Sequence, residues 1–283
     1  MTPWTDRAGQ YSALKMATLL ATLAPGIWLA VALLQDRLGG KPVTAAIHET
    51  GDWAVRFLLA SLAVTPLRRI ARWSRLILVR RMLGVAALGY AAAHLLLYVV
   101  DQSGDLVRVV SEIALRTYLT IGFVALLGLA LLGITSTDAT IRRLGRSWGR
   151  LHRCVYAIGV LTLVHYFLQS KLNTMQASFM AGLFVLLMTY RLADRFATTM
   201  AFRQLAVLAI AGGLATAAIE FAWVGLATNL PAVGILKANL DFSYQIRPAW
   251  WVLGCGLAFA ALAALRAPAT GSAASRLREP VAR

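Results

Sequence analysis

Residues 80–100 read RRMLGVAALGYAAAHLLLYVV, two arginines followed by an apolar run that contains one histidine. A bilayer core about 30 Å thick requires roughly 20 apolar residues in a helix that rises about 1.5 Å per residue. The run Met82–Val100 has that length and carries no Asp, Glu, Lys or Arg. It therefore predicts a membrane-spanning helix that holds one histidine, His94, inside the bilayer.

Similar apolar runs recur along the 283 residues, of which 14% are charged, fewer than is usual for a soluble domain. The weakest candidate is Trp53–Leu67, because only Phe57–Leu67 is free of charge. The sequence thus predicts an all-α, polytopic membrane helix bundle of eight spans. The other runs are Met16–Leu34, Thr117–Thr137, Cys154–Ser170, Leu172–Tyr190, Gln204–Leu226 and Pro248–Leu265.

The net charge is +16, and the basic residues that produce it lie between the apolar runs, which argues against a nucleic-acid partner. By the positive-inside rule, a cytoplasmic N-terminus and C-terminus place most Lys and Arg in cytoplasmic loops, provided that the short second span is kept. Arg56 must then reach the interface or find a partner. The basic connectors 68–81 and 135–153 fit two readings: topology anchors that contact anionic membrane lipid, or a docking surface for an acidic partner or an anionic cofactor.

Four segments are expected: a cytoplasmic N-terminal segment 1–15, a core 16–193, an additional C-terminal helix pair 194–265, and a tail 266–283. The tail is rich in Ala, Ser, Pro and Arg, a composition typical of disorder. Glu220 lies inside the predicted span of the additional pair. It fits either an ion pair or a proton site.

The histidines are the candidate functional residues, since ionisable groups inside a membrane are costly. His94 follows Arg81 by thirteen residues, and His165 follows His152 by the same number, about 20 Å of helix in each case. His94 and His165 should therefore share a level near the outer face, where two imidazoles could hold the iron of a heme. Packing against backbone or hydroxyl groups is the alternative. His48, in a predicted outer loop, is expected to be a surface residue.

His152 is the less secure candidate ligand. On a straight helix it would point about 140° away from His165, so one helix serves two hemes only if its start is loosened or bent. An interfacial role beside Arg150 and Arg153 is the alternative. The sequence has no CxxC, HExxH or Walker A motif, so electrons would enter from another protein, a quinone or a bound flavin.

Several motifs in order resemble one family, the MsrQ (formerly YedZ) heme-binding subunits of bacterial periplasmic methionine sulfoxide reductase systems, within the ferric reductase-like transmembrane group. The resemblance covers roughly Gly51–Tyr190. Its motifs are Gly51 with Trp53–Phe57, Thr65–Arg69, Arg80–Gly84, Tyr90–His94, Thr117–Gly122, Thr135–Thr137, Arg142–Gly145, Trp148, Leu151–Arg153, Val155-Tyr156 and His165.

The resemblance implies a ferric reductase-like core of about six spans in the bacterial inner membrane. It implies an electron-transfer subunit, itself without catalytic residues. This subunit takes electrons from the quinone pool or a cytoplasmic flavin reductase and passes them through heme b to the periplasmic molybdopterin enzyme MsrP. FMN is a further cofactor of the family. The family's heme ligands carry over to His94, His152 and His165. Because Arg80 stands where related oxidases have a fourth histidine, one heme is more secure than two.

Two other hypotheses remain open at this point. The first is a stand-alone ferric, metal or quinone reductase with the same membrane fold. The second is a non-redox transporter or receptor with structural histidines, although the paired broken helices expected in many transporters are not evident.

Overall fold

Seven helices in the described part of the chain are long and apolar enough to cross a membrane. The computed structural model describes residues 4–5, 9–170, 173–196, 200–228, 230–243 and 245–266. The predicted all-α, polytopic membrane bundle is confirmed, and the chain is a multi-pass membrane protein. The seven spans are α1 (Ala13–Leu34), the segment Ser74–Asp101 that contains α3 (Arg80–Asp101), α5 (Thr117–Ile134), the segment Arg146–Ser170 that contains α8 (Val155–Ser170), α9 (Met175–Ala193), α10 (Phe202–Ala227) and α12 (Pro248–Leu265).

The eighth long helix, α2 (Pro42–Ile70), contains the short predicted span and is much longer than it. Its charged middle is accommodated because Arg56 pairs with Asp52 one turn away at 3.4 Å and lies over the Trp53 ring. Pro42 occupies the first turn, where its missing N–H costs no hydrogen bond. The outer loop predicted around His48 is therefore helical from Pro42 onward, and the exposed His48 lies on α2.

Short helices fill the connections. The amphipathic α4 is the longest of them, and the Asp105 side chain caps it by accepting a hydrogen bond from the Arg108 backbone N–H. The sequence did not predict these elements, because each is too short to form an apolar run of spanning length. They are η1 (Ser74–Val79), α4 (Leu106–Leu115), α6 (Asp138–Leu144), α7 (Arg146–Leu151), η2 (His152–Cys154) and α11 (Val233–Ala238).

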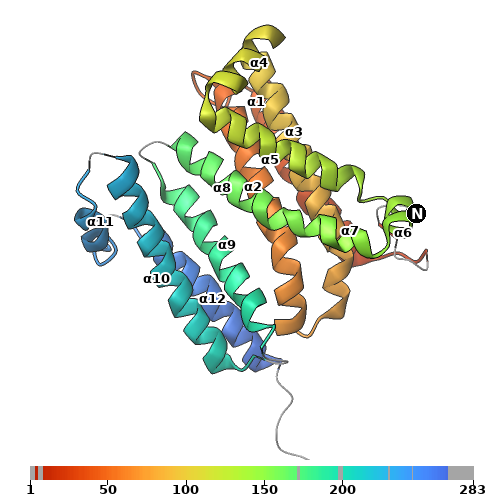
Figure 1. Cartoon of the computed structure of the whole chain (residues 1–283), viewed down its shortest axis with the longest axis vertical. Coiled ribbons are helices and arrows are strands. Elements are labelled where there is room, and N and C mark those ends of the chain that lie inside the picture. The colour runs from red at the N-terminus through yellow and green to blue at the C-terminus, as the bar shows by residue number, and fades with distance from the viewer. Residues whose placement is uncertain are drawn as a thin grey trace, which may run out of the picture.

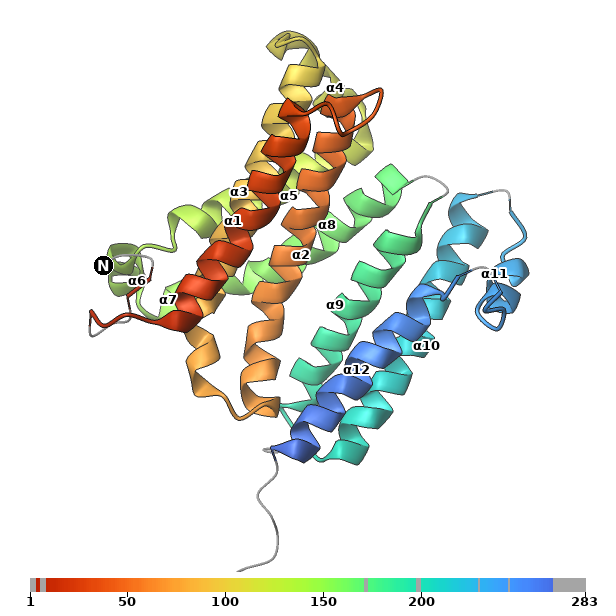
Figure 2. The same cartoon turned by 180° about the vertical axis from the view of Figure 1, so that it is seen from behind.

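The long helices pack in two groups (Figure 1). Helices α2, α3, α5 and α8 enclose one apolar core around Leu58, Ala87 and Leu129, and α1 lies along the outside of α2 and α3 (Figure 2). Helices α9, α10 and α12 enclose another around Tyr190 and Val252. A third core joins the groups, because side chains of α2 and α8 pack against α9.

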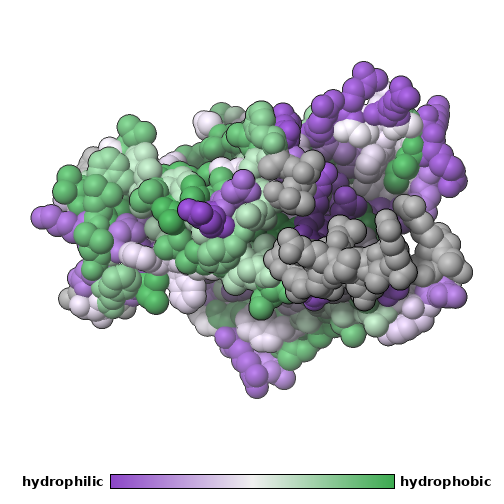
Figure 3. All heavy atoms as spheres, turned by 90° about the horizontal axis from the view of Figure 1, so that it is seen from below, coloured by the Kyte–Doolittle hydropathy of each residue, from purple (hydrophilic) through white to green (hydrophobic). Residues whose placement is uncertain are grey.

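Ion pairs tie the helix ends together at one end of the bundle, here named the arginine end. Arg81 at the start of α3 pairs with Asp138 of α6 at 2.5 Å, and Arg69 at the end of α2 pairs with Asp194 after α9. On the face seen from below, hydrophilic residues are densest at the upper right and hydrophobic residues cover most of the left half (Figure 3). Large apolar side chains such as Leu34 and Leu214 are exposed on the flanks, as is expected where lipid replaces water.

The additional C-terminal helices form an antiparallel pair that packs on α9. Glu220 of α10 is fully buried and pairs with Arg247 at the start of α12, which satisfies the prediction that this acid could find an ion-pair partner. The predicted disordered tail lies outside the described residues, apart from Arg266.

Candidate heme site

The rings of His94 and His165 face each other across the bundle. His94 lies near the end of α3 and His165 near the end of α8, at the end of the bundle opposite the arginine end. The ring centroids are 6.3 Å apart and the ring planes are perpendicular, at 89°. The prediction that these histidines share one level is confirmed. Helical rise sets the depth of each histidine along its helix, and the packing of the bundle brings the two rings together.

One nitrogen of each ring is held by a backbone carbonyl oxygen. His94 Nδ1 lies 2.8 Å from the carbonyl oxygen of Ile47 on α2, and His165 Nδ1 lies 2.8 Å from that of Tyr118 on α5. A carbonyl oxygen can only accept, so each Nδ1 carries the proton. Each Nε2 is then an unprotonated lone-pair donor, the form in which histidine binds a metal.

The separation of the rings fits two axial ligands of one heme iron. A metal–imidazole bond is about 2 Å and each ring centre lies roughly 1 Å beyond its nitrogen, so two axial rings have centres about 6 Å apart. The observed 6.3 Å agrees with this value. No group of three or more His, Cys, Asp and Glu residues gathers as a metal site among the described residues.

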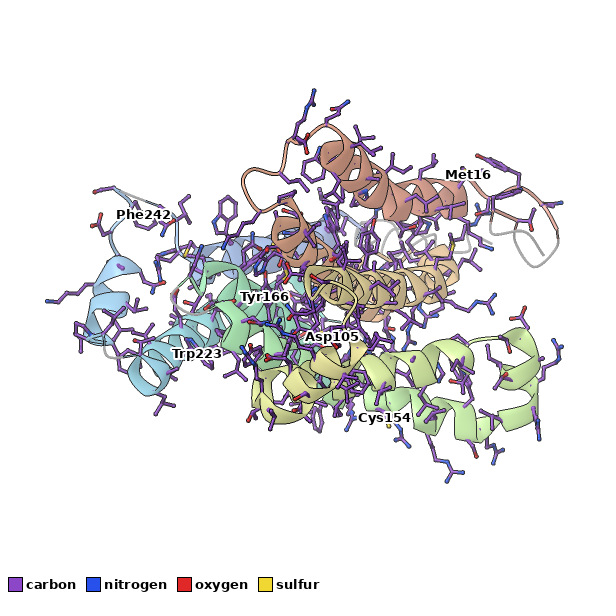
Figure 4. All side chains as sticks on the ribbon, turned by 90° about the horizontal axis from the view of Figure 1, so that it is seen from above. Met16, Asp105, Cys154, Tyr166, Trp223 and Phe242 are labelled. Carbon is purple, nitrogen blue, oxygen red and sulfur yellow. The ribbon has the colours of Figure 1, made fainter. Side chains whose placement is uncertain are left out.

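A polar network lies beside the paired histidines. Tyr166, which follows His165 on α8, donates a hydrogen bond to Asp52 of α2 at 2.5 Å (Figure 4). Asp52 also pairs with Arg56 at 3.4 Å. Next to this network, an open cleft of about 540 Å³ between α1 and α2 is lined by Trp28, Glu49, Trp53 and Arg56.

His152 lies apart from the pair, at the arginine end. It stands in the 3-10 turn between α7 and α8, so the loosened helix start that a second site would need is present. Its ring stacks on Trp148 at 3.9 Å, and both of its nitrogens have partners: Nδ1 lies 3.2 Å from the Trp148 carbonyl oxygen, and Nε2 lies 3.3 Å from Ser136 Oγ. The structure brings His94 and His165 together and leaves His152 without a facing histidine among the described residues.

Sequence reasoning missed the groups around the paired histidines. The carbonyls of Ile47 and Tyr118 have no sequence signature, because any residue supplies a carbonyl. Asp52 and Tyr166 are adjacent only in space. A signal was nevertheless present: in each case the carbonyl stands 47 residues before its histidine.

Comparison with known proteins gives concordant results. Residues 50–163 match the family model described as "Ferric reductase like transmembrane component"; this match includes His94 and His152 and ends just before His165. The chain is similar to "Protein-methionine-sulfoxide reductase heme-binding subunit MsrQ" of Xanthomonas campestris pv. campestris (strain 8004), with 41% identity over 190 residues, 65% of this chain and 87% of the relative. The protein of the same name from Azospira oryzae is 38% identical over 189 residues, 66% of this chain and 81% of the relative.

No solved structure was found to match the chain. The helical bundle, the paired histidines and the family model together define a ferric reductase-like membrane protein. Within that class, the identity and coverage of the curated relatives place the chain in the MsrQ family. Each of these two relatives aligns with about two thirds of this chain.

Proposed function

We propose that this chain is the membrane electron-transfer subunit of a protein-methionine-sulfoxide reductase system, with one heme b held between His94 and His165. The observation that carries the proposal is the pair of facing imidazoles, 6.3 Å apart, each with Nδ1 bound to a carbonyl. Heme supplies a one-electron carrier inside a membrane that no free charge crosses cheaply. The names of the relatives, which are heme-binding subunits, support the same cofactor.

The chain's own residues would orient and insulate this carrier. Helices α3 and α8 present the two Nε2 atoms, while the Ile47 and Tyr118 carbonyls fix the rings. The apolar core of α2, α3, α5 and α8 keeps water away from the space between the histidines and the arginine end. His152 remains a candidate ligand of a second heme. Its bonded nitrogens, and the lack of a facing histidine in the part of the chain that the structure describes, make one heme the favoured stoichiometry.

For the direction of electron flow, we infer donors within the membrane or at the arginine end, and MsrP at the histidine end. The cleft between α1 and α2 has indole walls and a carboxylate, a lining that suits a quinol headgroup. Alternatively, a cytoplasmic flavin reductase would meet the arginines of α6 and α7. We place the chain in the inner membrane with both termini cytoplasmic, on the basis of these arginines. FMN is an expectation that rests on the resemblance alone.

The domain boundaries are part of the same proposal. Residues 16–193 would be the functional core, and the helix pair within 194–265 would be an addition that supports α9. A stand-alone ferric, metal or quinone reductase is the competing function, since the fold and the paired histidines would serve it equally well.

The test is to purify the full chain and record heme per polypeptide by pyridine hemochrome, together with the reduced-minus-oxidised spectrum. We expect one low-spin b heme and its reoxidation on addition of MsrP with methionine sulfoxide. A heme that reduces ferric chelates but does not respond to MsrP would favour the stand-alone reductase. A chain without heme, expressed with ample heme supply, would contradict both.

A further inference from the structure

Gly51 and Gly122 occupy equivalent places at the two histidines. Gly51 stands one helical turn after Ile47 on α2, and Gly122 stands one turn after Tyr118 on α5. A Cβ atom built on Gly51 would lie 3.0 Å from Nδ1 of His94, and one on Gly122 would lie 2.6 Å from Nδ1 of His165. Each imidazole therefore rests where a side chain of the neighbouring helix would be.

Helix geometry explains why the glycine belongs at this position. In an α-helix each Cα–Cβ bond tilts toward the N-terminus, so the side chain at position i+4 covers the turn that contains carbonyl i. That carbonyl already accepts the backbone N–H of residue i+4. A second donor as bulky as an imidazole ring has less hindered access to that oxygen where the covering side chain is absent.

The arrangement occurs twice with the same spacing. Carbonyl and histidine are 47 residues apart at both sites, and the glycine follows the carbonyl by four. The hairpins α2–α3 and α5–α8 thus form two copies of one unit, in which the first helix provides the carbonyl and the glycine and the second provides the histidine. The two units face each other, and their rings are held at 89°.

We propose that Gly51 and Gly122 are positioning residues for the heme ligands: the missing side chains open two helical carbonyls, which fix the tautomer and the perpendicular planes of His94 and His165. This positioning role rests on the proposed function, in which His94 and His165 ligate the heme. The glycines touch the ligands and have no assigned contact with the iron. Their role differs from that of small residues that merely let helices approach.

Other glycines in the same bundle provide matched controls. A Cβ on Gly159 of α8 would lie 2.8 Å from the Phe184 ring, so this glycine serves helix packing alone. A Cβ on Gly89 of α3 would meet nothing within 4 Å. Gly159→Ala should therefore disturb packing on the same helix as His165, and Gly89→Ala should disturb nothing on the helix of His94.

The experiment compares Gly51→Ala, Gly122→Ala, Gly89→Ala and Gly159→Ala in the full-length chain, purified in lipid nanodiscs. Three readouts are heme per polypeptide, the midpoint potential of the heme, and the low-temperature electron paramagnetic resonance signal, which depends on the angle between axial rings. Thermal unfolding of the chain is the measure of general damage.

Gly122→Ala should lower heme affinity about tenfold or more, the range for loss of a group that orients a metal ligand. Gly51→Ala should have a smaller effect, because its Cβ would be less close to the ring. Where heme remains, the midpoint potential should rise, since a weaker Nδ1–H bond makes the imidazole a poorer donor to ferric iron. Should Gly122→Ala fail to fold, the heme content, midpoint potential and resonance signal of Gly51→Ala test the positioning role.

Unchanged heme content, potential and resonance signal in Gly51→Ala would overturn the proposal while the heme function stood. The same shifts in Gly159→Ala would also overturn it, because they would trace to packing. A wild-type chain that binds no heme would remove the proposed function itself. Shifts confined to Gly51→Ala and Gly122→Ala would support the positioning role.

Discussion

One histidine, His152, lies in the turn just before α8 and another, His165, lies in the second half of that helix, and their ring nitrogens have different partners. His165 has Nδ1 on a carbonyl and faces a second imidazole. His152 stacks on Trp148 and has partners at both nitrogens. A histidine within a membrane protein therefore becomes a ligand candidate through its neighbours. Residue type and helix position alone do not distinguish the two.

The largest effect on heme binding is expected from substitution of the paired histidines. His94→Ala and His165→Ala should each abolish the six-coordinate low-spin heme spectrum, because a single imidazole leaves one axial position of the iron open. Absorption spectra of the purified, reduced variants measure this, with His48→Ala as the control on an exposed residue. An unchanged spectrum in both variants would defeat the assignment.

A second variant separates the C-terminal pair from the heme-binding end. Arg247→Ala leaves Glu220 buried without its partner, which should cost about 3 kcal/mol of stability. Thermal unfolding would detect the loss, and heme per folded polypeptide should stay at the wild-type level. Glu220→Gln in the same chain should restore part of the stability. Loss of heme from the folded protein would mean that the pair belongs to the functional core.

A smaller effect is expected where the polar network meets the paired histidines. Tyr166→Phe removes the hydrogen bond to Asp52 and should cost about 1 kcal/mol of stability. Heme content should remain, because neither axial nitrogen is touched. Titration of the midpoint potential and thermal unfolding are the measurements, with Tyr156→Phe, which removes the hydroxyl that accepts from Arg191, as a control farther from the pair. Complete heme loss would place Tyr166 among the residues that hold the cofactor.

The smallest effect on heme binding is expected from substitution of His152, at the arginine end. His152→Ala removes a ring that stacks on Trp148, so stability should fall slightly, by about 1 kcal/mol. Heme per polypeptide and the spectrum should match the wild type. A heme content that drops by half from a wild-type value of two would show instead that His152 ligates a second heme.

The sequence predicted the bundle and the level of the paired histidines for one reason. Helical rise is constant, so distance along the chain from Arg81 to His94 converts directly into depth. It could not predict the Ile47 and Tyr118 carbonyls, because the pairing of α2 with α3 and of α5 with α8 is decided by packing. The early start of α2 was readable from Lys41-Pro42, since proline is common in the first turn of helices.

Two other features, the partner of Glu220 and the helix α4, became evident only in the structure. The partner of Glu220 is Arg247, which lies 27 residues away at the start of another helix, and charge pattern alone did not single it out. The short α4 is amphipathic, with Val109 buried and Leu115 exposed, so its sequence is not uniformly apolar and does not resemble a membrane span.

A structure of the heme-loaded chain, in which the two iron–nitrogen distances are measured, would test the paired ligation itself. We expect His94 Nε2 and His165 Nε2 on opposite faces of one iron, each at about 2 Å. Iron bound by only one of these nitrogens, or by His152 in place of either, would contradict it.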